Sequence, residues 1–357
     1  MATIDLFENI EGAAEPNFKE VFACGTPQNF IDHIVTALPY SGYSDSKFYI
    51  CEVDNAEYLT KLSFYKKSNP EIYNAAPANV TNPYDTEIKI LKILNQHFAD
   101  ANVTPCIIAV LHANRCKLKQ PTFTTHTPHT KLIADAFSKQ QDLVDRGLAS
   151  PYYSFTVLEE CDINILTFIN HMIDGSTVDN AVFVSLIFQL IYTLHVIAAK
   201  YPLFRHNDLH GDNVMLKFEH EFDPTVPRFL MFNDGTTKFY VPYFGVIVKI
   251  IDFGFASIPE QKVVSAVTLD PTIMFSRPDN DLLFFMSDVY GSSNKKKSVE
   301  RLFDKIAPAA YKATTAGELR KAAATFPSYK TICSKPVFDA YRKPVGPAMI
   351  FAKFDPP

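Results

Sequence analysis

Two polar segments, each of which follows a run of apolar residues in the sequence, constrain the fold of this chain most strongly. The first, 206–213 (HNDLHGDN), follows the almost continuously apolar stretch 181–199. The second, 252–254 (DFG), follows the apolar run VIVKII at 246–251. The lengths of the two runs predict a buried helix and a short buried strand, respectively. We therefore expect the chain to emerge from a hydrophobic core at both polar segments, with acidic side chains at the surface of that core.

The stretch 181–199 also raises the alternative of a membrane span, because about 20 apolar residues cross a bilayer. No basic cluster precedes this stretch. It contains four polar residues: Ser185, Gln189, Thr193 and His195. We therefore favour a buried helix of a soluble core over a membrane segment.

The composition is ordinary for a globular protein. The 357 residues are 47% hydrophobic and 20% charged, with a net charge of −5 and a pI of about 6.1, so no overall basic footprint for nucleic acid is present. Residues 1–12 lack an apolar signal-peptide core, and we expect no secretory signal. The six cysteines form no C-x-x-C pair and predict reduced thiols in a cytosol-like compartment.

The first half of the chain is rich in predicted strands. Short apolar and alternating segments predict strands at 47–53, 57–64, 103–110 and 152–158. The polar stretch 117–150 lies between the last two and is interpreted as an insertion with a helical turn or two. Further on, 229–243 predicts a β-hairpin with an Asn-Asp-Gly turn.

One helix in the first half has a clear start signal. Asn82 is suited to cap it, and Pro83 to occupy its first position. The 3–4 residue spacing then places Glu87 on the same face as Leu91 and Leu94. An acid among core-directed residues is unusual, so Glu87 is a candidate functional residue.

Phosphoryl transfer from ATP requires magnesium held against the phosphates, a cation on their oxygens and an acid that orients the acceptor hydroxyl. The segment 206–213 resembles the H-R-D-L-x-x-x-N catalytic loop of protein kinases, and 252–254 resembles their D-F-G segment. The resemblance implies that Asp208 is the catalytic base. It further implies that Asn213 and Asp252 bind Mg²⁺.

The resemblance also implies residues upstream of these motifs. Lys61, on a predicted strand, matches the lysine that contacts the ATP phosphates, and Glu87 matches the acid that fixes this lysine. Gly42 and Ser44 occupy the place of the glycine-rich phosphate loop, although only one glycine is present there. Asp281 resembles the buried aspartate that anchors the catalytic loop.

The segment 157–161 resembles the hinge between kinase lobes, whose backbone meets adenine. The resemblance therefore makes Glu159, Glu160 and Cys161 candidate nucleotide-binding positions, with the main chain mattering more than the side chains.

Several positions depart from the common kinase pattern. Asn207 replaces the arginine that pairs with a phosphorylated activation loop, so we expect no phosphorylation switch of that kind. His210 replaces a lysine and gives a D-L-H-x-x-N loop similar to that of haspin-type and small-molecule kinases. No A-P-E motif follows Gly254. The long spacing of 44 residues between Asp208 and Asp252 resembles the serine/threonine kinases of large nucleocytoplasmic DNA viruses.

The resemblance implies an α+β, two-lobed kinase-like fold with a small β-rich lobe and a larger, mainly helical lobe. The expected organisation is an N-terminal extension at 1–35, a small lobe at 36–161 with the insertion 117–150, and a large lobe at 162–357 that includes a hairpin at 218–245.

The implied function is that of a protein serine/threonine kinase using ATP and Mg²⁺, with a protein substrate and a cytoplasmic or virion location. We infer no specific nucleic acid and no membrane span. Two alternatives stay open. One is a pseudokinase scaffold or virion component, favoured by the degenerate glycine loop, and the other is a small-molecule kinase, suggested by His210.

Overall fold

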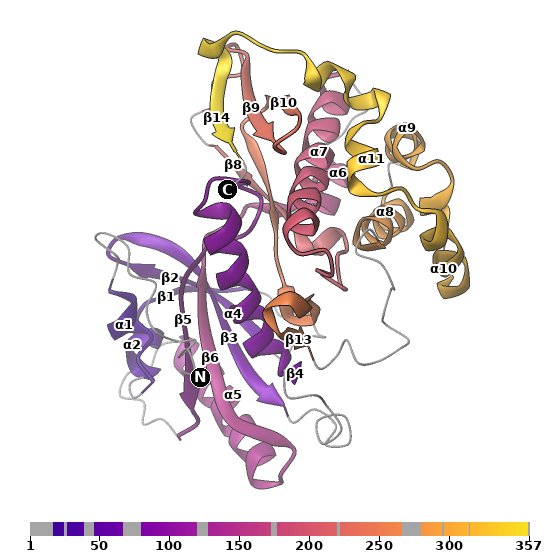
Figure 1. Ribbon diagram of the computed structural model, residues 1–357. Helices are drawn as coiled ribbons and strands as arrows, with labels where there is room; N and C mark the ends of the chain where they lie inside the picture. The colour runs from indigo at the N-terminus through magenta and orange to yellow at the C-terminus, as the bar shows by residue number, and fades with distance from the viewer. Residues whose placement is uncertain are drawn as a thin grey trace. The chain divides into compact units, whose positions relative to one another are not determined.

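The computed structural model describes ten stretches of the chain: residues 17–24, 27–38, 46–66, 80–119, 128–172, 177–219, 222–265, 280–294, 296–313 and 315–355. They combine helices and strands in an α+β fold with two compact units (Figure 1). Unit 1 comprises residues 1–77 and 109–160, and unit 2 comprises residues 78–108 and 161–357.

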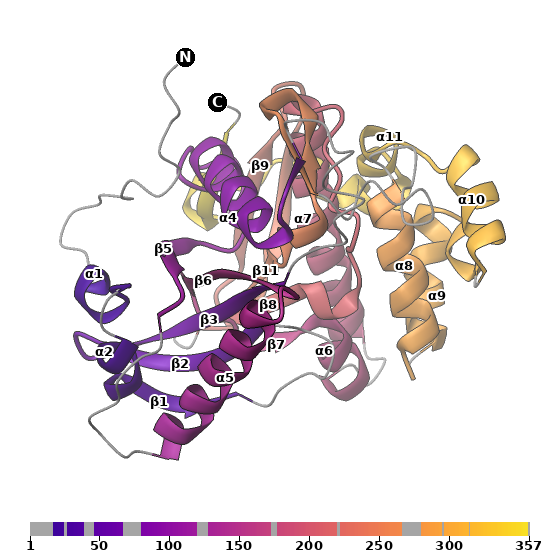
Figure 2. The ribbon, with the colours of Figure 1, turned by 90° about the horizontal axis from the view of Figure 1, so that it is seen from below.

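Unit 1 is built on one antiparallel sheet with the strand order β1-β2-β3-β6-β5 (Figure 2). Asp54 and Asn55 join β2 to β3 with positive φ angles, as tight hairpin turns require. The elements of unit 1 are α1 (Phe18–Val21), α2 (Pro27–Asp32), β1 (Ile34–Ala37), β2 (Ser46–Val53), β3 (Ala56–Lys66), β5 (Val110–Lys117), α5 (Pro128–Asp145) and β6 (Ala149–Leu158).

Helices α1, α2 and α5 cover one face of this sheet. Alternate residues of each strand point to that face, because side chains alternate across a strand. Phe22 and Phe30 both contact the ring of Phe155 on β6, and Phe137 of α5 packs edge-on against Phe64. The N-terminal segment described by the structure, which begins at residue 17, therefore contributes to the hydrophobic core of unit 1.

The bounds of one predicted strand were wrong. The strand expected at 103–110 begins only at Val110, because Pro105 cannot donate a ladder hydrogen bond and Cys106 N binds the side chain of Thr104. The predicted insertion 117–150 has a longer helix than the turn or two expected from the sequence. It contains an 18-residue helix, α5, whose Ile133 and Phe137, one turn apart, are buried in the core.

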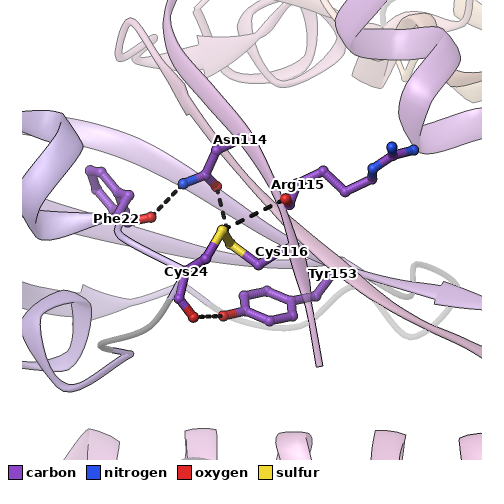
Figure 3. The surroundings of a disulfide bond; sticks show 6 residues. All are labelled: Phe22, Cys24, Asn114, Arg115, Cys116 and Tyr153. Atoms are coloured by element: carbon purple, nitrogen blue, oxygen red, sulfur yellow. Dashed lines mark hydrogen bonds between the residues drawn. A yellow bond between two sulfur atoms is a disulfide. The ribbon is translucent and has the colours of Figure 1, made fainter. Parts of the chain in front are cut away.

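The expectation of six reduced cysteines was also wrong. Cys24 and Cys116 form a disulfide across a sequence separation of 92 residues (Figure 3). The fold brings them together because Asn114 donates to the carbonyl of Phe22 and Tyr153 donates to that of Cys24. The other four cysteines form no disulfide in the structure: Cys51, Cys106 and Cys333 are buried, and Cys161 is half-buried.

Unit 2 contains three small sheets and the longest helix of the described residues. Its elements up to the second polar segment are β4 (Val80–Thr81), α4 (Pro83–Leu94), the π-helical turn η1 (Asn95–Ala99), β7 (Ile163–Asn164), α6 (Ile165–Met172), α7 (Thr177–Lys200), η2 (Gly211–Asn213), β8 (Val214–Phe218), β9 (Arg228–Asn233), β10 (Lys238–Tyr243), β11 (Val246–Ile250) and η3 (Phe253–Phe255).

The remaining elements of unit 2 are β12 (Ser257–Ile258), η4 (Pro259–Gln261), β13 (Val263–Ser265), α8 (Asn280–Ser292), α9 (Lys296–Ile306), η6 (Ala310–Lys312), α10 (Ala316–Thr325), α11 (Tyr329–Cys333), η7 (Pro336–Arg342), η8 (Pro347–Met349) and β14 (Ile350–Phe354). The hairpin expected from the sequence is formed by β9 and β10, and β14 pairs with β9 from the other side.

Helix α7 includes the apolar stretch that raised the membrane alternative. Its residues 180–200 are long and apolar enough to cross a bilayer, and 72% of the most apolar window is buried within the protein. Its polar side chains have partners within unit 2. Ser185 donates to the carbonyl of Pro242, and Gln189 accepts from Val248 N. These contacts make α7 a core helix that packs on β11 and on β10, and Figure 1 shows β10 next to it.

Helix α4 is part of unit 2, although the sequence predicted a single small lobe at 36–161. The start signal acts as expected, since the Asn82 side chain accepts from Tyr84 N. The helix packs on η3 and β13, and β4 just before it pairs with β13. Residues 78–108, which include this helix, therefore belong to unit 2.

Candidate active site

The loop 206–213 is anchored by a buried carboxylate on α8. Asp281 accepts hydrogen bonds from His206 N at 2.6 Å and from Asn207 N at 2.9 Å. This is the anchoring that the sequence suggested for Asp281. Burial raises the pKa of Asp281 to about 7, while the two backbone donors lower it.

His206 joins this loop to the segment that carries Asp252. The fully buried imidazole donates from Nε2 to the carbonyl of Ile251 at 2.9 Å, and its ring lies 4.8 Å from that of Phe253. Burial lowers the pKa of His206 to about 4, so the ring is neutral at pH 7. Its position makes it a structural residue that fixes the spacing of the two polar segments.

Asp208 and Asn213 are joined within the loop. The Asn213 amide donates from Nδ2 to the Asp208 carbonyl at 2.8 Å and to Asp208 Oδ2 at 3.4 Å. Burial raises the pKa of Asp208 to about 6; nearby His210 opposes this shift and Asp252 adds to it. About one third of the Asp208 side chain remains exposed, so a substrate hydroxyl has access to it.

His210 lies between two carboxylates. Its Nε2 is 3.9 Å from Asp208 Oδ2, and its Nδ1 is 3.9 Å from Asp212 Oδ2. Nδ1 also accepts from Asp212 N at 3.4 Å, which leaves Nε2 as the nitrogen that carries the proton in the neutral ring. The ring is therefore oriented with an N–H donor near Asp208.

Asp252 emerges next to Asn213. Strand β11 ends at Ile250, and Asp252 then turns sharply with a left-handed φ of 60°. Ile251 N donates to the Asn213 carbonyl at 3.1 Å, so Asp252 and Asn213 lie on adjoining backbone segments. The structure thus brings together four of the candidate residues: Asp208, His210, Asn213 and Asp252.

The donor set suits magnesium rather than a fully protein-enclosed metal. Within the described ranges, no group of three or more His, Cys, Asp or Glu side chains forms a metal cluster. Because Asn213 uses Nδ2 for Asp208, its Oδ1 is the atom left for a cation, alongside the carboxylate of Asp252. Mg²⁺ typically takes one or two protein oxygens and completes its shell with phosphate and water.

Glu87 is almost completely buried, with 5% of its surface exposed. It lies on α4 in unit 2, and this helix packs directly on η3, the turn that follows Asp252. The predicted face is present, because Leu91 and Leu94 are also fully buried.

Lys61 lies on β3 in unit 1, on the sheet face opposite the core. Leu62 and Phe64 point toward the helices, so strand alternation turns Lys61 the other way. It pairs in register with Phe48 and Thr156, and its Nζ lies 5.7 Å from the centre of the Phe48 ring. Nearby on this face, Ser46 and Ser63 share a hydrogen bond of 2.7 Å, so the row around Lys61 is largely polar.

The other candidate nucleotide-binding positions divide into described and undescribed residues. Gly42 and Ser44 lie outside the described residues. Glu159 accepts from Ala109 N through Oε1 at 2.8 Å, so its side chain secures the backbone at the end of β6. Glu160 is exposed and Cys161 is half-buried. In the sequence, unit 1 ends at Glu160 and unit 2 resumes at Cys161.

One contact in this region was missed by the sequence analysis. Gly211 N donates to the carboxylate of Asp288, on the same helix as Asp281. The signal in the sequence was the spacing, since two acids seven residues apart lie on one face of a helix.

Comparison with known proteins supports the resemblance to viral kinases. No family model matches the chain. Two proteins of Acanthamoeba polyphaga mimivirus are similar, each provisionally designated a serine/threonine-protein kinase. One is 28% identical over 229 residues, and the other is 23% identical over 284 residues.

These similarities cover 59% and 70% of this chain, and 45% and 68% of the respective relatives. The chain thus matches less than half the length of the first relative. The chain is a distant homologue of viral proteins designated as protein kinases, which confirms the resemblance drawn from its motifs.

Proposed function

We propose that this protein is an ATP- and Mg²⁺-dependent phosphotransferase, and specifically a protein serine/threonine kinase. The observation that carries the proposal is the connection of Asp208, Asn213 and Asp252 through two short hydrogen-bonded links within unit 2. A base beside two oxygen ligands for a divalent cation is what phosphoryl transfer to a hydroxyl requires. The kinase designation of the two viral relatives supports the same reaction class.

The residues of the site have distinct proposed roles. Asp208 orients the acceptor hydroxyl and takes its proton, since its raised pKa lies close to neutral pH. His210, which has its Nε2–H near Asp208, donates to a γ-phosphate oxygen. Asn213 and Asp252 hold Mg²⁺, which, when bound, neutralises charge on the phosphates.

Lys61 and Glu87 complete the proposed set. The resemblance to protein kinases gives Lys61 the role of binding the α- and β-phosphates and Glu87 the role of fixing this lysine. The same resemblance gives the main chain at 159–161 the role of meeting the adenine ring, and it makes Gly42 and Ser44, outside the described residues, candidate phosphate-binding positions. The acceptor is a protein hydroxyl, and a cytoplasmic or virion location stays a prediction.

The proposal is tested by measuring Mg²⁺-dependent ATP binding by calorimetry and phosphate transfer to peptide arrays. We expect ATP binding that requires Mg²⁺, is weakened at least about 10-fold by Asp252→Asn, and is unchanged by Asp142→Asn, an exposed carboxylate on α5. Labelled serine or threonine peptides support a protein kinase. Binding without peptide labelling, but with labelling of small hydroxylated compounds, supports a small-molecule kinase.

The pseudokinase alternative predicts a different pattern, and the single glycine in the phosphate loop favours it. Absence of both ATP binding and Mg²⁺ binding in the folded wild-type protein would exclude the enzyme and leave the scaffold.

A further inference from the structure

Helix α8 contacts the candidate catalytic loop at two points. Asp281 receives the backbone N–H groups of His206 and Asn207, at the start of the loop. Asp288 receives Gly211 N at 2.8 Å, near its end. Seven residues correspond to about two helical turns, so both carboxylates project from the same face of α8.

The second contact is a close one. A Cβ atom placed on Gly211 would lie 3.2 Å from Leu166 Cβ, 3.3 Å from Asp288 Oδ2 and 3.4 Å from Val289 Cγ2. Glycine therefore allows the loop backbone to approach both α6 and α8 at this point.

The residues on either side of Gly211 carry the proposed chemistry. Gly211 begins the short turn η2, whose last residue is Asn213, and His210 immediately precedes it. Asn213 N donates to the His210 carbonyl at 3.0 Å. A displacement of Gly211 therefore moves both the histidine and the candidate metal ligand.

We propose that Asp288 is a positioning residue that holds the end of the catalytic loop, so that His210 and Asn213 keep the geometry needed for phosphate transfer. The proposal rests on the proposed kinase function and deepens it. Asp281 alone fixes only the start of the loop. With Asp288, one rigid helix sets both ends, while 208–210 in between stay available to substrate.

The role depends on the hydrogen-bond acceptor rather than on a bulky side chain. Asp288→Asn keeps an oxygen that accepts from Gly211 N, whereas Asp288→Ala removes it. Ser292→Ala is the matched control, because Ser292 Oγ donates only to the other oxygen of Asp288, at 3.4 Å.

The first readout is steady-state phosphate transfer. We expect Asp288→Ala to lower kcat by about 10- to 100-fold, because small displacements of reacting groups are costly, with the KM for ATP within about 3-fold. Asp288→Asn should stay within about 3-fold of wild type, and Ser292→Ala should be unchanged. Equal loss in Asp288→Asn and Asp288→Ala, or no loss in either, would overturn the proposal.

The second readout is amide hydrogen exchange over 206–213, which needs no enzymatic activity. We expect faster exchange at Gly211 in Asp288→Ala, wild-type exchange in Asp288→Asn, and unchanged exchange in α7 of both variants. If wild type transfers no phosphate, the kinase proposal fails while exchange still decides the anchoring role. Unchanged exchange at Gly211, or faster exchange throughout unit 2, would refute it.

Discussion

The disulfide between Cys24 and Cys116 predicts a large dependence of stability on redox state. The perturbation is the double variant Cys24→Ser, Cys116→Ser, which removes the bond without leaving an unpaired thiol. The bond closes a loop of 92 residues. For a loop of this length, the chain-entropy relation gives about 4.6 kcal/mol of stabilisation through the unfolded state.

This magnitude converts into a measurable shift for unit 1, which contains both cysteines. A loss of about 4.6 kcal/mol corresponds to a fall in Tm of roughly 15 °C for a unit of this size. The assay is urea and thermal denaturation followed by circular dichroism, under oxidising conditions. Cys161→Ser is the control, because Cys161 is a half-buried cysteine outside the disulfide.

Wild-type protein treated with a reductant should approach the double variant, because Cys24 is exposed and a small thiol can reach it. Burial of Phe22 and Phe30 in the core should keep the N-terminal segment folded after reduction. A double variant within about 1 kcal/mol of wild type would refute the reasoning. Peptide mapping that finds no 24–116 bond in oxidised protein would do so as well.

Three further predictions concern unit 2. Asn207 has a φ of 64° and donates to the Phe255 carbonyl, so Asn207→Ala should be about 1 kcal/mol less stable in thermal melts than Asn207→Gly, which tolerates this backbone. The folded pKa of Asp281 is raised to about 7, so the stabilisation from this residue is lost as the pH rises from 4 to 7. Urea titrations should therefore show that Asp281→Asn lowers the free energy of unfolding, relative to wild type, by about 4 kcal/mol more at pH 4 than at pH 7. The folded pKa of His206 is lowered to about 4, so the stabilisation from this residue is lost as the pH drops from 6.5 to 4. Over that range the free energy of unfolding of His206→Asn should fall by about 3 kcal/mol less than that of wild type.

The outcomes that would contradict these three differ. Equal melting of the two Asn207 variants would show that the left-handed backbone carries no strain. Parallel pH profiles for wild type and Asp281→Asn would show that this carboxyl titrates normally in the folded protein. Parallel pH profiles for wild type and His206→Asn would likewise show that the His206 imidazole titrates normally in the folded protein.

The candidate site was largely readable from the sequence, because it depends on short-range patterns. Asp208 and Asn213 are five residues apart in a segment that resembles the catalytic loop of protein kinases, and a motif this short is visible in the sequence alone. Glu87 was found because helical periodicity and the Asn82 cap together fix which residues share a face.

The features that the sequence did not reveal depend on long-range contacts. Cys24 and Cys116 meet only because β5 and the N-terminal segment share one core, which no local pattern encodes. Helix α4 joins unit 2 because its partners lie some 165 residues later in the chain. Asp288 was missed although its seven-residue spacing from Asp281 places both acids on one helix face, because its partner Gly211 lies 77 residues earlier in the chain.

The measurement that tests the account most directly is the initial rate of γ-phosphate transfer from labelled ATP to a generic protein acceptor at saturating Mg²⁺. Wild type, Asp208→Ala and Asp252→Asn are compared, each shown to be folded by circular dichroism. The account predicts Mg²⁺-dependent labelling by wild type, with Asp208→Ala slower by about 10²–10⁴-fold and Asp252→Asn similarly impaired. Undiminished transfer in Asp208→Ala would contradict it.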